Sequence, residues 1–262
     1  GTQLMLAGLA SGDSGELWNL SHPERVLKIQ RNYVEAGADC LITNTFGASR
    51  LMLQRHGHAD DLRAINQAGA RIAREAFGDR PGFVLGDLGP LGAILKPYGE
   101  LPQDEARAAY EEQARALVEG GADAIIIETQ TSLEEIGVAI DGAKAAGAPC
   151  IIASFAYDRS MDNTFYVTMM GVLPEQAAAF VAERGANIVA LNCGTGMDMA
   201  GAAMVAKIYR ASRDLPVMVQ PNAGLPVMEK LKAVYKQPPA DMAAGVSDVL
   251  AAGANIIGSC CG

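Results

Sequence analysis

Four segments of the chain share one pattern of polar and apolar positions. Each segment ends a helix-like stretch, passes through a glycine and continues into a short run of mostly aliphatic residues. Glycine suits the left-handed conformation that commonly ends a helix, and an aliphatic run is typical of a strand buried on both faces. The pattern therefore predicts a helix end followed by a buried strand at four places: 35–44, 119–128, 183–192 and 251–260.

Three further aliphatic runs lie between these segments, and helical patterns separate the strands. The additional strands are expected at 83–87, 149–155 and 215–220. Ser21 is the expected cap of the first helix. Because strands and helices alternate, the sheet should be parallel and the fold class α/β. The expected helices cover 23–36, 60–77, 103–119, 132–146, 174–183, 200–213 and 241–252.

The even recurrence of the strand pattern favours a (β/α)8 TIM barrel over an open doubly wound sheet. No G-x-G-x-x-G follows an early strand, which argues against the dinucleotide-binding form of the open sheet. The pattern predicts seven strands, and the chain stops at Gly262 directly after the last of them. We therefore expect a single barrel domain over 1–262, trimmed of its first strand and its last helix.

Composition and charge argue against several classes of partner. Hydrophobic residues make up 50% of the chain, which is enough for a sizeable core. The formal net charge is −9, so a nucleic-acid partner is not expected. No apolar run reaches the roughly 18 residues of a membrane-spanning helix, and no secretion signal is visible at the start. With five cysteines, an odd number, we expect reduced thiols and a cytoplasmic protein.

The residues that end the predicted strands are polar, and they include carboxylates and thiols. In barrels of this kind the active site lies at the carboxyl ends of the strands, so these residues are the candidates for chemistry. They are Asn44, Thr45, Phe46, Asp87, Glu128, Thr129, Phe155, Asn192, Cys193, Gln220, Pro221, Asn222, Ser259, Cys260 and Cys261.

Three of the cysteines fall at the ends of two strands, which predicts a metal site. Cys193, Cys260 and Cys261 could hold one Zn²⁺ and leave a fourth position open. Successive strand residues point to opposite faces, so the adjacent pair can share a metal only where the strand has already ended. Alternatively, Cys193 is a small buried residue and the Cys-Cys pair is a redox pair or chance. Cys40 and Cys150 start strands and are expected in the core.

Short motifs along the whole chain match one known family. They are Gly1-Thr2, Glu16-Leu-Trp-Asn19, His22-Pro-Glu24, Ala36-Gly-Ala-Asp39, Thr43-Asn-Thr-Phe-Gly-Ala48, Gly86-Asp-Leu-Gly-Pro90, Ile127-Glu-Thr129, Met169-Met-Gly171, Asn192-Cys-Gly194, Gln220-Pro-Asn-Ala-Gly224 and Gly258-Ser-Cys-Cys-Gly262. With these motifs the chain resembles the homocysteine S-methyltransferases, a family that includes betaine-dependent and S-methylmethionine-dependent enzymes and the homocysteine-binding module of cobalamin-dependent methionine synthase. That family normally has Asp-Gly before Gly1 and a glycine in place of Ser259.

The resemblance implies a zinc methyltransferase that holds homocysteine as a thiolate and methylates it to methionine. The zinc ligands would be Cys193, Cys260 and Cys261, with Asn222 as a displaceable fourth ligand or, alternatively, as the cap of its own turn. Glu128 would receive the substrate's ammonium or, alternatively, cap the next helix. For Asp87, a pocket role and a loop-capping role are both open. Other contacts to the amino-acid end of the substrate are expected from Asn44, Thr45 and Phe46.

Two kinds of methyltransferase remain possible, and they differ in the methyl donor. The Gln220-Pro-Asn-Ala-Gly224 match favours a methyl-corrinoid supplied by another domain or protein. The alternative is a free-standing enzyme that uses betaine or S-methylmethionine. Two rivals from other classes are a non-catalytic zinc-binding barrel and a lyase or aldolase with Glu128 and Asp87 as acid and base.

Overall fold

The computed structural model describes residues 1–10, 12–229, 232–235 and 237–262, and it divides into two compact units. Unit 1 contains Gly1–Glu128 and Gly137–Ile151, and unit 2 contains Thr129–Ile136 and Ile152–Gly262. The chain passes from the first unit to the second within one strand, between Glu128 and Thr129. Among the described residues, no helix has both the length and the apolar character needed to cross a membrane.

Unit 1 is an α/β unit whose strands are parallel. Its strands pair in the order β1-β2-β3, with Leu41 opposite Val84 and Asp87 opposite Ile126. The strands are β1 (Cys40–Ile42), β2 (Phe83–Leu88) and β3 (Ala124–Gln130, to Glu128 in this unit). The helices are α1 (Thr2–Leu6), η1 (Gly15–Leu17), α2 (Trp18–Ser21), α3 (Pro23–Glu35), α4 (Arg50–Gln54), η2 (Ala59–Asp61), α5 (Leu62–Phe77), α6 (Gln103–Glu119) and α7 (Leu133–Ala145, from Gly137 in this unit).

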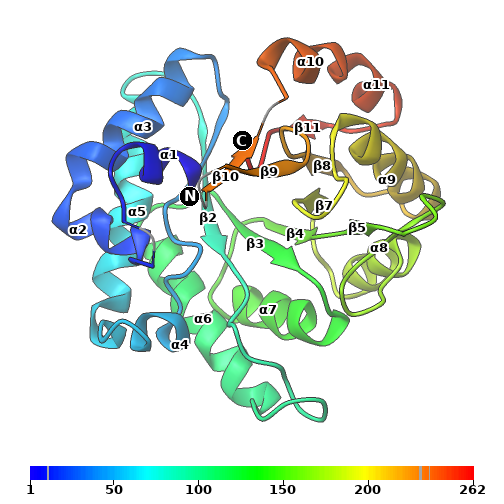
Figure 1. Ribbon diagram of the computed structural model, residues 1–262. Helices are drawn as coiled ribbons and strands as arrows, with labels where there is room; N and C mark the ends of the chain where they lie inside the picture. Colours follow the sequence, from blue (N-terminus) through cyan, green and yellow to red (C-terminus); the bar gives the residue numbers. More distant parts are fainter. Residues whose placement is uncertain (11, 230–231, 236) are drawn as a thin grey trace. The chain divides into compact units, whose positions relative to one another are not determined.

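Unit 2 repeats the arrangement, with strands paired in the order β4-β7-β8-β11. In Figure 1, α8 and α9 lie beside each other next to β7 and β8, with which they are in contact. Two antiparallel hairpins, β5–β6 and β9–β10, follow β4 and β8. The elements are β4 (Ile151–Phe155), β5 (Asp158–Arg159), β6 (Tyr166–Val167), α8 (Pro174–Glu183), β7 (Ile188–Asn192), α9 (Met199–Ser212), β8 (Val217–Gln220), β9 (Pro226–Glu229), β10 (Lys232–Tyr235), α10 (Pro239–Ala244), α11 (Val246–Ala251) and β11 (Ile256–Ile257).

The repeated sequence pattern has a definite structural role. Its glycines, Gly37, Gly121, Gly185 and Gly253, all have positive φ angles between 78° and 100°, as the helix-ending role predicts. Two residues further on, Asp123 and Asn255 each use a side-chain oxygen to accept a backbone N–H near the start of the neighbouring strand, from Val84 at 2.6 Å and from Val217 at 3.0 Å. The repeat therefore ends a helix and aligns two strands.

The core consists of aliphatic residues with a few paired polar groups. In unit 1, one cluster contains Leu4, Trp18, Val26 and Ile72, so the only tryptophan is a packing residue. In unit 2, the hydroxyls of Tyr157 and Tyr209 are 2.8 Å apart, and Tyr209 also donates to the Ala190 carbonyl at 3.1 Å. Burial raises the pKa of both phenols, so they act as neutral hydrogen-bonding groups that hold α9 against β7.

All seven predicted strands are present and parallel, which confirms the α/β class. Several details differ from expectation. The helix expected over 60–77 begins at Leu62, after a 3-10 turn, and the one expected over 241–252 is two short helices, α10 and α11. They meet at Gly245, where an added Cβ would lie 2.6 Å from Met199 Cβ. Ser21 is not a cap: its hydroxyl donates to the Leu17 carbonyl, and His22 precedes the helix.

Candidate functional site

Three thiols converge in unit 2 at the ends of two strands. Cys193 directly follows β7, and Cys260 and Cys261 follow β11. The Sγ atom of Cys261 lies 4.0 Å from that of Cys193 and 3.8 Å from that of Cys260, and all three sulfurs lie within 4.8 Å of one another. This is the one group of metal-ligating side chains of this kind in the part of the chain that the structure describes.

The backbone has left the strand geometry at each of the three cysteines. Strand β11 ends at Ile257, so the adjacent pair is free of strand alternation, as the sequence required. The Cys260 N–H donates to the Pro221 carbonyl at 2.9 Å, and the Cys261 carbonyl accepts from Ala223 at 2.8 Å. Cys193 has a φ of 57°, a left-handed conformation that is uncommon outside glycine. These bends aim the three sulfurs at a common point.

Asn192, the last residue of β7, is fully buried and joins the thiol cluster to neighbouring strand ends. Its Oδ1 accepts from the Thr129 backbone N–H at 3.0 Å and from the Ser154 hydroxyl at 2.7 Å. Its Nδ2 donates to Thr129 Oγ1 at 2.8 Å and lies 3.8 Å from Cys260 Sγ. The carboxamide therefore contacts one of the three sulfurs directly.

Asn222 connects the two loops that carry the cysteines. Its Nδ2 donates to the Gly194 carbonyl at 3.0 Å, and its Oδ1 accepts from the Cys261 backbone N–H at 3.2 Å. Neither contact is to the backbone of its own turn: both partners lie in other segments of the chain. The side chain is 4% exposed and ties the residue after Cys193 to Cys261.

The thiols perturb one another's ionisation. Hydrogen bonds from Cys193 and Cys260, with a smaller contribution from Tyr235, lower the pKa of Cys261. Hydrogen bonds to Cys193 and Cys261, together with burial, raise the pKa of Cys260. Burial, followed by the hydrogen bond to Cys261, raises the pKa of Tyr235, so its phenol stays neutral and can donate to the sulfur.

The candidates at the strand ends of unit 1 form a second polar group. Asn44 donates to the Gly15 carbonyl at 2.8 Å and to Asn19 Oδ1 at 3.1 Å. Thr45 is fully buried, and its hydroxyl donates to the Asp87 carbonyl at 2.9 Å. Phe46 is 40% exposed, so it alone of these three presents a large apolar surface to solvent.

Asp87 is a buried carboxyl within this group. It is 3% exposed, and among the described residues no hydrogen-bond donor reaches its Oδ1. Burial, then the negative charges of Glu128 and Glu16, raise the pKa of Asp87 well above its usual range. Its backbone N–H donates to Thr43 Oγ1 at 3.0 Å, so a hydrogen bond fixes the main chain at this strand end. Glu128 is half-buried at the end of unit 1.

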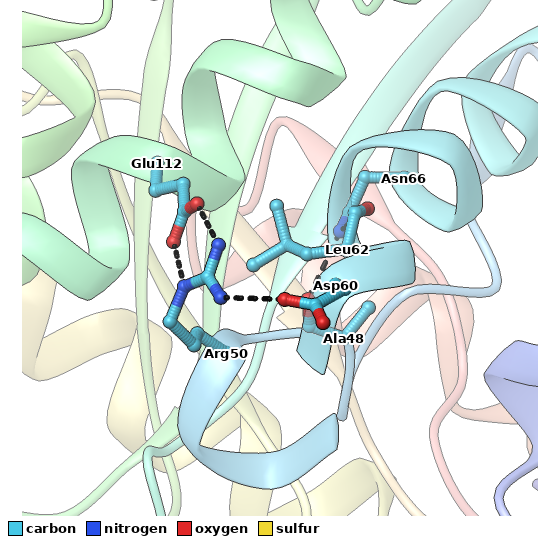
Figure 2. Close-up of polar contacts among 6 residues, drawn as sticks. All are labelled: Ala48, Arg50, Asp60, Leu62, Asn66 and Glu112. Carbon is cyan, nitrogen blue, oxygen red and sulfur yellow. Dashed lines mark hydrogen bonds and ion pairs between the residues drawn. The ribbon is translucent and has the colours of Figure 1, made fainter. Parts of the chain in front are cut away.

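Helices α5 and α6 support the loop after β1 with buried amides. Gln113 donates to the Thr45 carbonyl at 2.8 Å and to Asn66 Oδ1 at 3.2 Å. Asn66 in turn donates to the carbonyls of Ala48 and Leu62 (Figure 2). At the surface, Arg50 pairs with Glu112 through two hydrogen bonds of 2.8 and 2.5 Å. The two buried amides therefore bind main-chain carbonyls of the loop after β1 and of helix α5.

The comparisons with known proteins identify the family. The family model for homocysteine S-methyltransferase matches residues 1–262. The chain belongs to this family. The resemblance inferred from the sequence motifs is therefore confirmed.

Members of the homocysteine S-methyltransferase family with similar sequences include methionine synthases. The chain is 35% identical over 278 residues to the methionine synthase of Mycobacterium tuberculosis (strain ATCC 25618 / H37Rv), which covers 100% of this chain and 23% of that protein. It is 33% identical over 276 residues to that of Mycobacterium leprae (strain TN), covering 100% of this chain and 22% of the relative. The chain therefore spans less than a quarter of the length of these curated relatives.

A solved homocysteine methyltransferase structure shares the fold. The metallated form of MmuM from Escherichia coli superposes with a TM-score of 0.78 and 21% sequence identity, covering 99% of this chain and 88% of that one. This confirms the barrel-type α/β fold class expected from the strand repeat.

The structure brings some predicted site residues together, and it adds others. It gathers the three cysteines with Asn222 in unit 2, and Asn44, Thr45 and Asp87 in unit 1. The roles of these residues, and the single-domain division, stay predictions. The hydrogen bonds of Asn192 and Tyr235 to the cysteines were not predicted. For Asn192, the available signal was its position at a strand end, directly before Cys193. Tyr235 lies in the β9–β10 hairpin, which the sequence pattern did not predict.

Proposed function

We propose that this chain binds zinc through Cys193, Cys260 and Cys261 and methylates homocysteine to methionine. The observation that carries the proposal is the convergence of three sulfurs within 4.8 Å of one another, in a chain of the homocysteine S-methyltransferase family. The donor set fits the metal, because thiolate sulfurs select zinc over hard cations and three of them leave a fourth position open.

The chemistry that zinc supplies when bound is to lower the pKa of a coordinated thiol, so that homocysteine is present as a thiolate at neutral pH. The homocysteine sulfur attacks the methyl carbon of the donor, a new S–CH₃ bond forms, and the electron pair of the broken bond leaves with the donor. No side chain is needed as a general base. The chain's contribution is to hold three sulfurs at one point, through the bends at the strand ends and the contacts of Asn192 and Asn222.

The contacts proposed for the amino-acid end of the substrate follow from the family resemblance. Glu128 would receive the ammonium group, and Asn44, Thr45, Phe46 and Asp87 would form the surrounding contacts. The unpartnered Oδ1 of Asp87 supports this assignment, because a buried carboxyl oxygen without a hydrogen bond has capacity for a ligand.

For the methyl donor we favour a corrinoid carried by another domain or protein. The support is that the chain is 35% and 33% identical to two methionine synthases and spans less than a quarter of each. The alternative is a small onium donor, betaine or S-methylmethionine, and the experiment below distinguishes the two kinds of donor.

The test is reconstitution with zinc, followed by an assay of methionine formation from homocysteine with methylcobalamin, betaine and S-methylmethionine as separate donors. The wild-type protein should bind one zinc per chain, and Cys193→Ser or Cys261→Ser should reduce this well below one. Cys40→Ser and Cys150→Ser are the matched controls, because these thiols lie outside the cluster. Zinc loss in the controls but not in the cluster variants would overturn the metal site. Full zinc binding without methionine formation from any donor would leave only a zinc-binding barrel.

A further inference from the structure

The carboxamide of Asn192 uses all of its hydrogen-bonding capacity. Two donors, the Thr129 backbone N–H and the Ser154 hydroxyl, reach its oxygen at 3.0 and 2.7 Å. Two acceptors, Thr129 Oγ1 and Cys260 Sγ, lie 2.8 and 3.8 Å from its nitrogen. Since Asn192 and Ser154 are both fully buried, no water competes for these positions.

The orientation of this carboxamide is fixed by its neighbours. A backbone N–H can only donate, so the group that faces the Thr129 N–H must be the carboxamide oxygen. The nitrogen then has to face the opposite side, where it meets Thr129 Oγ1 and Cys260 Sγ. One amide hydrogen is therefore directed at the sulfur of a predicted metal ligand.

Thr129 holds the carboxamide from two sides at a cost in backbone energy. Its φ of 59° is in the left-handed region, which a β-branched residue rarely adopts. In this conformation both its backbone N–H and its hydroxyl contact Asn192. Strain of this kind persists where the surrounding structure requires it, and it clusters at functional sites.

We propose that Asn192 is a positioning residue that holds the Cys260 sulfur at the metal centre through an amide N–H···S hydrogen bond. This inference rests on the proposed function, because it concerns the same three cysteines. A donor to a ligand atom fixes the orientation of that ligand and withdraws part of its negative charge. Loss of such an outer contact typically costs about 10–100-fold in metal affinity.

The decisive variant is Asn192→Asp, which has nearly the same shape. Its carboxylate keeps an acceptor for the Thr129 N–H and for Ser154, but it replaces the NH₂ group with an oxygen that faces Cys260. Ser154→Ala is the matched control, because it removes a hydrogen bond of the same carboxamide and leaves the N–H···S contact in place. Asn192→Ala removes the amide without adding charge, and it serves if Asn192→Asp does not fold.

The measurements are zinc affinity, by competition with a chromophoric chelator, and the sulfur-to-metal charge-transfer bands of the Co²⁺-substituted protein. We expect Asn192→Asp and Asn192→Ala to weaken zinc binding about tenfold or more and to shift the Co²⁺ bands. Ser154→Ala should leave the bands unchanged and the affinity within about threefold.

Three outcomes would overturn the inference. Equal losses in Ser154→Ala and the Asn192 variants would show that the carboxamide only braces the strand ends. Wild-type affinity and bands in the folded Asn192 variants would show that the N–H···S contact has no effect. A wild-type protein that binds neither Zn²⁺ nor Co²⁺ would overturn the proposed metal site together with this inference, and the wild-type titration alone distinguishes that case.

Discussion

Gly194 lies directly against the backbone of Tyr157. A Cβ atom added at position 194 would be 1.9 Å from the Tyr157 carbonyl oxygen, and Gly194 has a φ of 99°. The loop that carries Cys193 therefore passes so close to the segment after β4 that only glycine fits. The Gly194 carbonyl also accepts a hydrogen bond from Asn222, and Asn222 in turn accepts one from the Cys261 backbone N–H. Gly194 is therefore connected to Cys261 through Asn222.

Gly194→Ala should destabilise the protein and disturb the thiol cluster. We expect a loss of about 2–5 kcal/mol in the free energy of unfolding, from left-handed strain of about 1–2 kcal/mol and overpacking of about 1–3 kcal/mol. Urea unfolding measures the loss. Gly171→Ala is the control, because Gly171 also has a positive φ but has no atom within 4 Å of the added Cβ. Equal losses in the two variants would mean that the contact with Tyr157 is unimportant.

Asn222→Ala should leave zinc bound and change the affinity for homocysteine. The three sulfurs remain, but the link between Gly194 and Cys261 and the predicted displaceable oxygen are both lost. We expect a change of about threefold or more in the homocysteine dissociation constant, measured by isothermal titration of the zinc-loaded protein. Asn32→Ala, on an exposed face of α3, is the control. The idea fails if homocysteine affinity is unchanged, or if zinc is lost as in a cysteine variant.

Gln113→Leu should destabilise unit 1. The fully buried Gln113 amide satisfies the Thr45 carbonyl and Asn66 Oδ1, and an apolar replacement leaves both without that donor. The expected loss is about 1–3 kcal/mol in urea unfolding. Gln103→Leu, at the exposed start of the same helix, should change stability by less than about 0.5 kcal/mol. A loss no larger than in Gln103→Leu would contradict the supporting role of Gln113.

Asp87 should make the protein less stable as the pH rises. The folded state raises the pKa of Asp87 well above its usual range, so above the unfolded pKa of about 4 the folded protein keeps a proton that the unfolded chain releases. Stability from this group therefore falls with increasing pH until the folded pKa is passed. Asp87→Asn should remove this fall, as measured by urea unfolding at several pH values between 4.5 and 8. The exposed Asp79→Asn should retain the wild-type slope.

Methyl transfer should persist at pH values well below about 8.5, the ordinary pKa of a free thiol. If the metal site holds homocysteine as a thiolate, the rate does not depend on thiolate that forms in solution. The pH profile of methionine formation measures this, with the alkylation rate of free homocysteine as the reference. A rate that rises in parallel with free thiolate up to that pKa would remove the metal from the mechanism.

The fold was largely determined by local sequence patterns. Each repeated segment places a helix-ending glycine before an aliphatic run, and each of the four glycines has the positive φ that this role requires. Such features depend on residues close together in the chain, so the strands and most of the helices could be predicted. The hairpins β5–β6 and β9–β10 could not, because strands of two to four residues are too short to show a period.

The three cysteines could be placed at a common site because parallel strands end at the same edge of a sheet. What surrounds them was decided only by tertiary structure. Asn192 contacts Ser154 because the register of β4 against β7 pairs Ser154 with Ala190, which lies two residues before Asn192. Its contact with Cys260 follows from the orientation that its neighbours impose on the carboxamide. Asp87 carries a raised pKa because folding buries it near Glu16, a residue far away in the sequence. Hydrogen bonds and desolvation depend on distances of a few ångströms between distant segments, and a linear sequence does not contain those distances.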